Sequence, residues 1–219
     1  MSLRVDGLLL DCDGVLVDSH SAAAVVWNLW AKRWAPGFDF DRDVEHGRRI
    51  SDVVAELIST PSDVAAAAAD LVHRELDHAV DVAAMPGAGQ LLDFSPAGTW
   101  AVVTSGSRAI ATARMASAGL AHADVLVTGE DVEHGKPFPD PYLLAAQRLG
   151  VSPQRCAVFE DAPAGIAAAR AAGVATIIGV GAIAAAARVT AAVADLRGVR
   201  FDGHHLRIDA STILPPGSE

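Results

Sequence analysis

Short apolar runs and longer segments with helical periodicity alternate through most of the chain. The apolar runs lack polar alternation, which is typical of strands buried on both faces of a parallel sheet. We expect strands at residues 8–10, 100–104, 125–128, 156–159 and 174–180, and helices at residues 108–118, 140–149 and 165–172. This order predicts an α/β fold with a doubly wound parallel sheet.

Residues 20–84 break this alternation, because their apolar positions recur at helical spacing. We expect one helix through residues 26–34, a second at residues 50–58, and an Ala-rich third from residue 62 or 63 to about residue 78. No strand signal interrupts the block. We therefore expect residues 19–85 to form an all-helical cap, inserted into a core made of residues 1–18 and 86–219. The two connections are the expected hinge.

A tryptophan face marks the first of these helices. Trp27, Trp30 and Trp34 fall on one side of a helix together with Val26. We interpret this face as the internal core of the cap rather than as a surface on which a sugar stacks.

The last part of the chain has weaker patterns. The Ala-rich residues 182–195 are expected to form a final covering helix, and residues 200–208 are compatible with a short edge strand or a hairpin. Residues 214–219 contain two prolines and a glycine and are expected to be loose.

Composition excludes several classes of partner. The chain has 219 residues, of which 51% are hydrophobic, enough for one large domain or for a core with a small insert. No apolar run approaches the ~20 residues that cross a bilayer, and we find no signal-peptide pattern. The net charge of −10 argues against nucleic acid or an anionic membrane as a partner. We expect a monomer.

Two rare residue types add information. Cys12 and Cys156 are the only cysteines and cannot form a metal-ligand set, which favours a reducing, cytoplasmic setting. Only Lys32 and Lys136 are lysines, although Lys and Arg together number 17. A lysine in a loop of this chain is therefore a candidate for a specific role.

Two aspartates follow the first expected strand. Because side chains alternate along a strand, Asp11 and Asp13 project to one side and Cys12 to the other. Ligands of open parallel sheets bind beyond the carboxyl ends of the strands, and two adjacent carboxylates need a cation or a shared proton. The alternative is an ordinary turn that contains two aspartates. A calcium loop is excluded, because positions five and six of such a loop, counted from Asp11, are Val15 and Leu16.

Three further polar clusters lie where expected strands end, and so gather at the same edge. The hydroxyl of Ser105 and the N–H of Gly106 could hold a phosphate at a helix start, or Ser105 could be a simple helix cap. Lys136 lies in a Gly-Lys-Pro loop, and it could either bind the phosphate or be an ordinary solvated lysine. Glu160 and Asp161 would complete a metal site if they face Asp11, or Asp161 could cap a helix.

These clusters together resemble the haloacid dehalogenase-like (HAD) hydrolases. Residues 11–19, Asp-Cys-Asp-Gly-Val-Leu-Val-Asp-Ser, are similar to the first family motif, in the subgroup that has a small helical cap and includes β-phosphoglucomutase and the sugar and polyol phosphatases. Residues 103–107, 135–137 and 160–161 resemble the second, third and fourth motifs. Haloacid dehalogenases lack the second aspartate, so Asp13 favours the phosphatase branch.

The resemblance implies a Rossmannoid core and a role for each matching residue. Asp11 would attack phosphorus, Asp13 would act as general acid and base, and Lys136 would neutralise the phosphate and orient Asp11. Ser105 and Gly106 would bind the phosphate. Magnesium (Mg²⁺) would be held by Asp11, the backbone oxygen of Asp13 and Asp161, with Glu160 contributing directly or through water.

The resemblance also implies the substrate class, a small phosphate ester of a sugar or polyol. In the cap, His46 and Arg49 are similar to residues of yeast-type glycerol-phosphate and deoxyglucose-phosphate phosphatases and are candidate substrate contacts; alternatively they are a solvated helix start.

Three other functions remain as alternatives. A phosphosugar mutase of the β-phosphoglucomutase type would use the same aspartates under a cap that excludes water. A phosphonoacetaldehyde hydrolase would need a cap lysine, for which Lys32 is the only candidate. A non-catalytic phosphosugar-binding module is disfavoured, because every catalytic position is filled.

Overall fold

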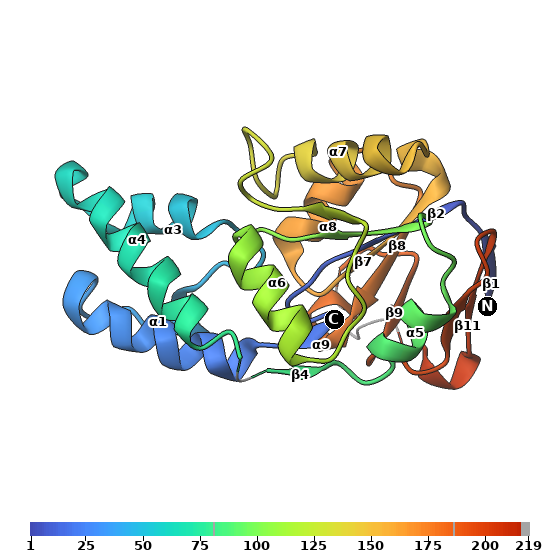
Figure 1. The fold of residues 1–219 in the computed structure, drawn as a ribbon, viewed down its shortest axis with the longest axis horizontal. Helices are drawn as coiled ribbons and strands as arrows, with labels where there is room; N and C mark the ends of the chain where they lie inside the picture. Colours follow the sequence, from blue (N-terminus) through green and yellow to red (C-terminus); the bar gives the residue numbers. More distant parts are fainter. Residues whose placement is uncertain (81, 186, 216–219) are drawn as a thin grey trace.

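The computed structural model describes residues 1–80, 82–185 and 187–215, and its centre is a six-stranded parallel sheet (Figure 1). The sheet order is β6-β5-β2-β7-β8-β9. The strands are β2 (Gly7–Leu10), β5 (Trp100–Val103), β6 (Val125–Val127), β7 (Cys156–Glu160), β8 (Thr176–Val180) and β9 (Ala191–Val193). The expected α/β fold with a parallel sheet is confirmed.

Helices cover both faces of this sheet because the strand side chains alternate between them. Leu9 of β2 packs toward α7 (Asp140–Leu149) and α8 (Pro163–Ala171). Leu8 and Leu10 pack toward the opposite side, with α5 (Ala88–Phe94) and α6 (Arg108–Ser117). All three leucines are fully buried. The carboxyl end of β2 is therefore held rigidly in the middle of the sheet.

Four helices form a separate layer beyond the carboxyl edge of the sheet (Figure 1). They are α1 (His20–Trp34), α2 (Phe40–Asp43), α3 (Ile50–Leu57) and α4 (Pro61–Asp77). Their own apolar core contains Trp27 and Trp30, and the Trp30 indole donates to the Ala67 carbonyl at 2.9 Å. Trp30 and Trp34 thus pack in the internal core, as expected, whereas Trp27 packs in this core and also lines a cavity at the sheet edge. The division of the chain into a cap and a core at residues 18 and 86 stays a prediction.

The connections between this layer and the core differ from the expectation of an insert without strands. Two short strands, β3 (Val17–Asp18) and β4 (Ala83–Ala84), pair antiparallel, with Val17 opposite Ala84. A pair of two-residue strands is too short to show a period in the sequence. The two connections therefore form one hydrogen-bonded ribbon.

The expected helix over residues 182–195 is wrong for most of its length. Helix α9 covers only Gly181–Ala185, and Ala191–Val193 instead form β9, which extends the sheet by pairing parallel to β8. Residue 186 lies outside the described residues. Alanine is the best helix former, but helix propensities differ by at most about 1 kcal/mol per residue among residues other than proline. The edge of β8 offers unpaired backbone groups, so the tertiary context decides.

The region of residues 200–208 is a hairpin, one of the two alternatives that its sequence allowed. Strands β10 (Val199–Phe201) and β11 (His205–Ile208) pair antiparallel, and β1 (Ser2–Arg4) joins β11 to give a small three-stranded sheet. Short 3₁₀ turns cover Pro153–Arg155 and Ala210–Thr212. Of the expected loose tail, residues 216–219 lie outside the described residues.

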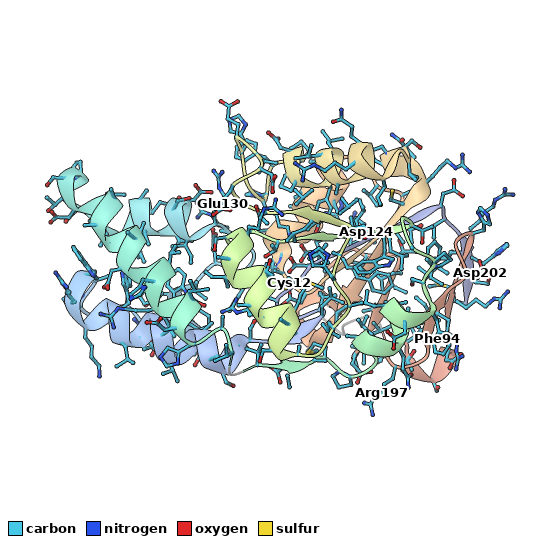
Figure 2. All side chains as sticks on the ribbon, in the orientation of Figure 1. Cys12, Phe94, Asp124, Glu130, Arg197 and Asp202 are labelled. Atoms are coloured by element: carbon cyan, nitrogen blue, oxygen red, sulfur yellow. The ribbon has the colours of Figure 1, made fainter. Side chains whose placement is uncertain are left out.

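The small sheet lies at the end of the molecule that is opposite the four-helix layer. Figure 2 shows Phe94 and Asp202 at this far end, and Cys12 in the interior. Within the described chain, no helix has both the length and the apolar character needed to cross a bilayer.

Gly87 fixes the return of the chain to the core. Its φ is 86°, and a Cβ there would lie 2.3 Å from the backbone carbon of Leu196, whose N–H bonds the Pro86 carbonyl at 2.9 Å. We expect Gly87→Ala to lower the free energy of unfolding, as measured by urea unfolding. Overpacking should cost about 1–3 kcal/mol, and the left-handed conformation should cost roughly another 1–2 kcal/mol. Gly98→Ala is the control, because Gly98 has φ 73° and nothing within 4 Å. Equal losses in both variants would contradict this account.

Candidate active site

The carboxyl ends of four neighbouring strands converge on one place. Strand β2 leads to Asp11, β5 to Ser105 and β7 to Glu160, while the loop after β6 carries Lys136. Because these strands are parallel and adjacent, their following residues share one edge of the sheet. The four sequence clusters are therefore neighbours in space.

Lys136 is a buried cation at the centre of this site. Its side chain is 0% exposed, and its ammonium donates to Asp11 Oδ1 at 2.8 Å, to Glu160 Oε1 at 2.6 Å and to the Val103 carbonyl at 3.1 Å. Burial alone would lower the pKa of Lys136, but the two carboxylates more than offset it, and the pKa is raised. All three ammonium donors are used, so the lysine is charged and fixed in position.

Three carboxylates surround this lysine and exceed its charge. Each of Asp11, Glu160 and Asp161 contributes one carboxylate oxygen to a group whose members all lie within 4.8 Å of one another. Burial, with the nearby Glu160, raises the pKa of Asp11 to about 7 against the opposing effect of Lys136. Burial and then Asp11 raise the pKa of Asp161. The cluster therefore has an excess of negative charge that a cation would stabilise.

The donor set fits a hard divalent cation such as Mg²⁺. Among the described residues, no hydrogen bond reaches either side-chain oxygen of Asp161, and only one oxygen of Asp11 accepts one. The Asp161 carboxylate lies over Gly14, where a Cβ would be 2.1 Å from Oδ2. Free carboxylate oxygens at a polar sheet edge are ligands that Mg²⁺ accepts, together with water.

Most of the hydrogen-bonding capacity of the Glu160 carboxylate is already used by protein groups. Its Oε1 accepts from Lys136 and, at 2.6 Å, from the Tyr142 hydroxyl, and its Oε2 accepts from the Ala162 N–H at 3.2 Å. A carboxylate offers about four lone-pair sites. Glu160 thus orients Lys136 and retains little capacity for a direct metal bond.

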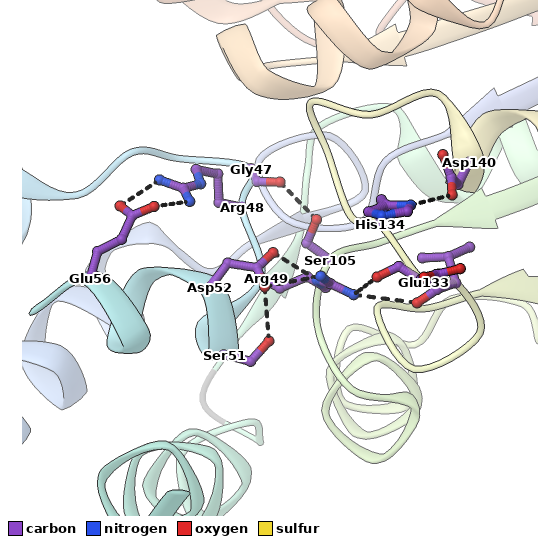
Figure 3. Close-up of polar contacts among 11 residues, drawn as sticks. Gly47, Arg48, Arg49, Ser51, Asp52, Glu56, Ser105, Glu133, His134 and Asp140 are labelled. Carbon is purple, nitrogen blue, oxygen red and sulfur yellow. Dashed lines mark hydrogen bonds and ion pairs between the residues drawn. The ribbon is translucent and has the colours of Figure 1, made fainter. Parts of the chain in front are cut away.

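Ser105 and Gly106 lie at the site but are engaged by protein groups. The Ser105 hydroxyl donates to the Gly47 carbonyl at 2.7 Å, and the Gly106 N–H donates to the Thr104 hydroxyl at 3.0 Å. The cap of α6 is Ser107, which accepts from the Ile110 N–H. Ser105 is therefore not the helix cap, and it joins the sheet edge to the four-helix layer (Figure 3).

The two candidate contacts in the helical layer lie in different environments. His46 is half-buried beside the rings of His20 and Phe40, at centroid distances of 5.4 and 5.2 Å, and burial lowers its pKa. Arg49 instead bonds Asp52 at 2.8 Å and the Glu133 carbonyl at 3.1 Å (Figure 3). Arg49 thus connects the helical layer to the loop that carries Lys136.

A cavity of about 150 Å³ lies between the helical layer and the sheet edge. Its floor includes Asp11, Asp13 and Asp161, and His46 lies in its wall, whereas Arg49 is not part of the lining. Two arginines line it, and both are already paired: Arg48 with Glu45 and Glu56, and Arg114 with Asp13 and Glu75. Among the described residues that line the cavity, each arginine therefore has a carboxylate partner.

Three buried polar residues near the site escaped the sequence analysis. They are Tyr142, Glu75 and Arg114. Arg114 follows Ile110 by one helical turn on the buried face of α6, and Glu75 follows Ala67 and Leu71 on the buried face of α4. A charged residue at an apolar position of the helical period was the available signal. Tyr142 is the only tyrosine of the chain.

Comparisons with known proteins agree with this geometry. The haloacid dehalogenase-like hydrolase family matches residues 5–173. Hexitol phosphatase A of Escherichia coli is 43% identical over 175 residues, or 78% of this chain and 81% of the relative. Glycerol-1-phosphate phosphohydrolase 1 of Saccharomyces cerevisiae is 34% identical over 79% of this chain and 74% of the relative. A hydrolase from Pseudomonas syringae has a TM-score of 0.70 and 25% identity, covering 80% of this chain and 84% of that structure.

Asp161 provides a direct test of the metal site. We expect Asp161→Asn to weaken Mg²⁺ binding at least about tenfold in calorimetry. Because burial and the nearby Asp11 raise the pKa of Asp161, its ionised form disfavours the fold at neutral pH. The metal-free variant should therefore be at least as stable as the wild type in thermal unfolding. Asp124→Asn, at an exposed position, is the charge-matched control. Unchanged Mg²⁺ affinity in Asp161→Asn would overturn the assignment.

Proposed function

Because this chain belongs to the haloacid dehalogenase-like hydrolases and is a phosphoric monoester hydrolase of that family, we propose that it releases phosphate from a small sugar or polyol phosphate. The observation that carries the proposal is the Asp11 carboxylate, held by buried Lys136 at the floor of a cavity that Asp13 also lines. Relatives named as a hexitol phosphatase and a glycerol-1-phosphate phosphohydrolase support this substrate class.

The proposed reaction has two steps on Asp11. Its carboxylate attacks phosphorus while Asp13 protonates the leaving alcohol, and the resulting aspartyl-phosphate is hydrolysed by water that Asp13 deprotonates. Lys136 keeps Asp11 oriented and offsets charge on the phosphate. Ser105 and Gly106 become phosphate donors when they exchange their present protein partners for substrate. Mg²⁺, held by Asp11, Asp161 and the Asp13 carbonyl, would neutralise phosphate charge.

The cavity supports a phosphatase over a mutase. A bisphosphate intermediate would place a second dianion near the helical layer and would need cations there. The two arginines that line the cavity are each paired with two carboxylates. Trp27, Phe40 and His46 offer apolar and neutral surface instead, which suits an uncharged leaving group.

Lys32 gives no support for a phosphonoacetaldehyde hydrolase. Its side chain is exposed and is absent from the residues that line the cavity. A Schiff base needs a lysine at the substrate. The filled set of carboxylates and the lysine likewise favours an enzyme over a binding module.

We also propose that residues 19–85 act as a cap that opens for substrate, and that the enzyme is a cytoplasmic monomer. The paired strands β3 and β4 join the two connections, so the helical layer would move as one body. Both cysteines are buried and free, which suits a reducing compartment.

Asp11→Asn tests the nucleophile. We expect at least about a thousandfold loss of phosphate release from hexitol, hexose and glycerol phosphates with Mg²⁺, because the amide cannot form the covalent intermediate. Asp18→Asn is the matched control within the same motif, since Asp18 is exposed and is not among the cavity-lining residues. Full magnesium-dependent turnover in Asp11→Asn would exclude the proposed role.

A parallel assay separates phosphatase from mutase. We expect phosphate release to exceed isomerisation of β-glucose 1-phosphate in the presence of a bisphosphate primer. The reason is that both arginines among the described lining residues are already paired and cannot bind a second phosphate without losing a partner. Rates would be followed by released phosphate and by NMR of the sugar. Isomerisation with little release would establish the mutase instead.

A further inference from the structure

A buried ionic bridge connects Asp13 to the last helix of the helical layer. Arg114 of α6 donates through one terminal nitrogen to Asp13 Oδ1 at 2.7 Å and through the other to Glu75 Oε2 of α4. The side chains of Arg114 and Glu75 are only 7% and 4% exposed. Helix α6 lies against the C-terminal part of α4, so the bridge crosses between core and helical layer (Figure 1).

The bridge is more than packing between two helices. Replacing a buried ion pair by apolar residues of similar volume is often neutral or stabilising, so adhesion of α4 to α6 alone does not call for these charges. The Nε of Arg114 is buried without a hydrogen-bond partner among the described residues. The guanidinium is therefore oriented toward Asp13 and Glu75 although one of its own donors is left unsatisfied.

A second donor, at the start of the helical layer, acts on the same oxygen. The Ser19 hydroxyl donates to Asp13 Oδ1 at 2.6 Å. Ser19 precedes α1 as its N-cap residue, yet its side chain does not bond the helix. A serine at this position normally caps, so here the local preference yields to the contact with Asp13.

These contacts distinguish the two oxygens of Asp13. Oδ1 accepts from Ser19 and Arg114, while no hydrogen bond to Oδ2 is found among the described residues. The Asp13 side chain is 33% exposed and lines the cavity. Oδ2 is thus the oxygen that is available to exchange a proton with a leaving group or with water.

We propose that Arg114 is a positioning residue for Asp13 and that Glu75 makes this positioning depend on the docked helical layer. The inference rests on the proposed function, in which Asp13 is the general acid and base. As the P–O bond of the ester breaks, the leaving oxygen keeps the electron pair and takes the proton from Asp13 Oδ2. In the second step Oδ2 takes a proton from the water whose oxygen bonds phosphorus, and the Asp11–phosphorus bond breaks.

The leaving group provides a readout that a purely structural role would not change. Glycerol phosphate and hexitol phosphates release an alcohol that needs a proton, whereas p-nitrophenyl phosphate releases a stable phenolate. The ratio kcat/KM reports the steps up to release of the leaving group. Misplacing Asp13 should therefore lower kcat/KM for the alkyl esters selectively. Slow hydrolysis of the aspartyl-phosphate should then give a burst of nitrophenolate.

Arg114→Met is the first variant. We expect kcat/KM for the alkyl esters to fall at least about tenfold, while kcat/KM for p-nitrophenyl phosphate changes at most about threefold. The variant should also show a burst of nitrophenolate that the wild type does not show. Glu75→Gln should show the same pattern more weakly. Arg108→Met is the control, because Arg108 lies on the same helix and pairs with Asp131. Equal losses for both substrate types, without a burst, would overturn the proposal.

Two further variants keep the test decisive. If Arg114→Met unfolds, the double variant Glu75→Met/Arg114→Met removes both charges. We expect it to regain stability in thermal unfolding but not the alkyl-ester rate, and recovery of that rate would overturn the proposal. Asp13→Asn tests the underlying function separately. If Asp13→Asn does not lose kcat/KM selectively for the alkyl esters, Asp13 is not the general acid. If Asp13→Asn shows this selective loss and Arg114→Met does not, only the role of Arg114 is refuted.

Discussion

The rest of the site depends on the enclosure of one ammonium group among carboxylates at the sheet edge. Lys136 has no solvent exposure and shares its donors among Asp11, Glu160 and a strand carbonyl. A buried charge is tolerated only with such complete pairing. Each partner sits at the carboxyl end of a different strand or in a following loop. The order of strands in the sheet is therefore a condition for the chemistry.

The same reasoning extends from the sheet edge to the helical layer. Ser105 bonds Gly47, Arg49 bonds loop carbonyls beside the lysine, and Arg114 joins Asp13 to Glu75. All of these contacts are hydrogen bonds or ion pairs. Partly exposed hydrogen bonds such as those of Ser105 and Arg49 can be exchanged for water or substrate at small net free energy, which would suit the proposed opening of this layer.

The four motif clusters were predictable because each lies at the end of an apolar run. A parallel sheet brings such ends together whatever the details of packing, so Asp11, Ser105, Lys136 and Glu160 could be grouped from sequence. Arg114 and Glu75, which link this group to the helical layer, could not be predicted from the sequence. Arg114 is 101 residues from Asp13, and Glu75 is 39 residues from Arg114. Only the packing of α6 against α4, beside the carboxyl end of β2, makes them neighbours.

The sequence by itself determined the alternation of strands and helices, the separate helical layer and the positions of the four motifs, because periodicity and strand ends are local properties. The tertiary structure alone decided that residues 191–193 complete the sheet, that residues 17–18 pair with 83–84, and that Glu160 supports Lys136. It also decided that Arg49 faces a core loop rather than the cavity. In each case the deciding hydrogen bonds or ion pairs join segments far apart in the chain, and no local pattern records them.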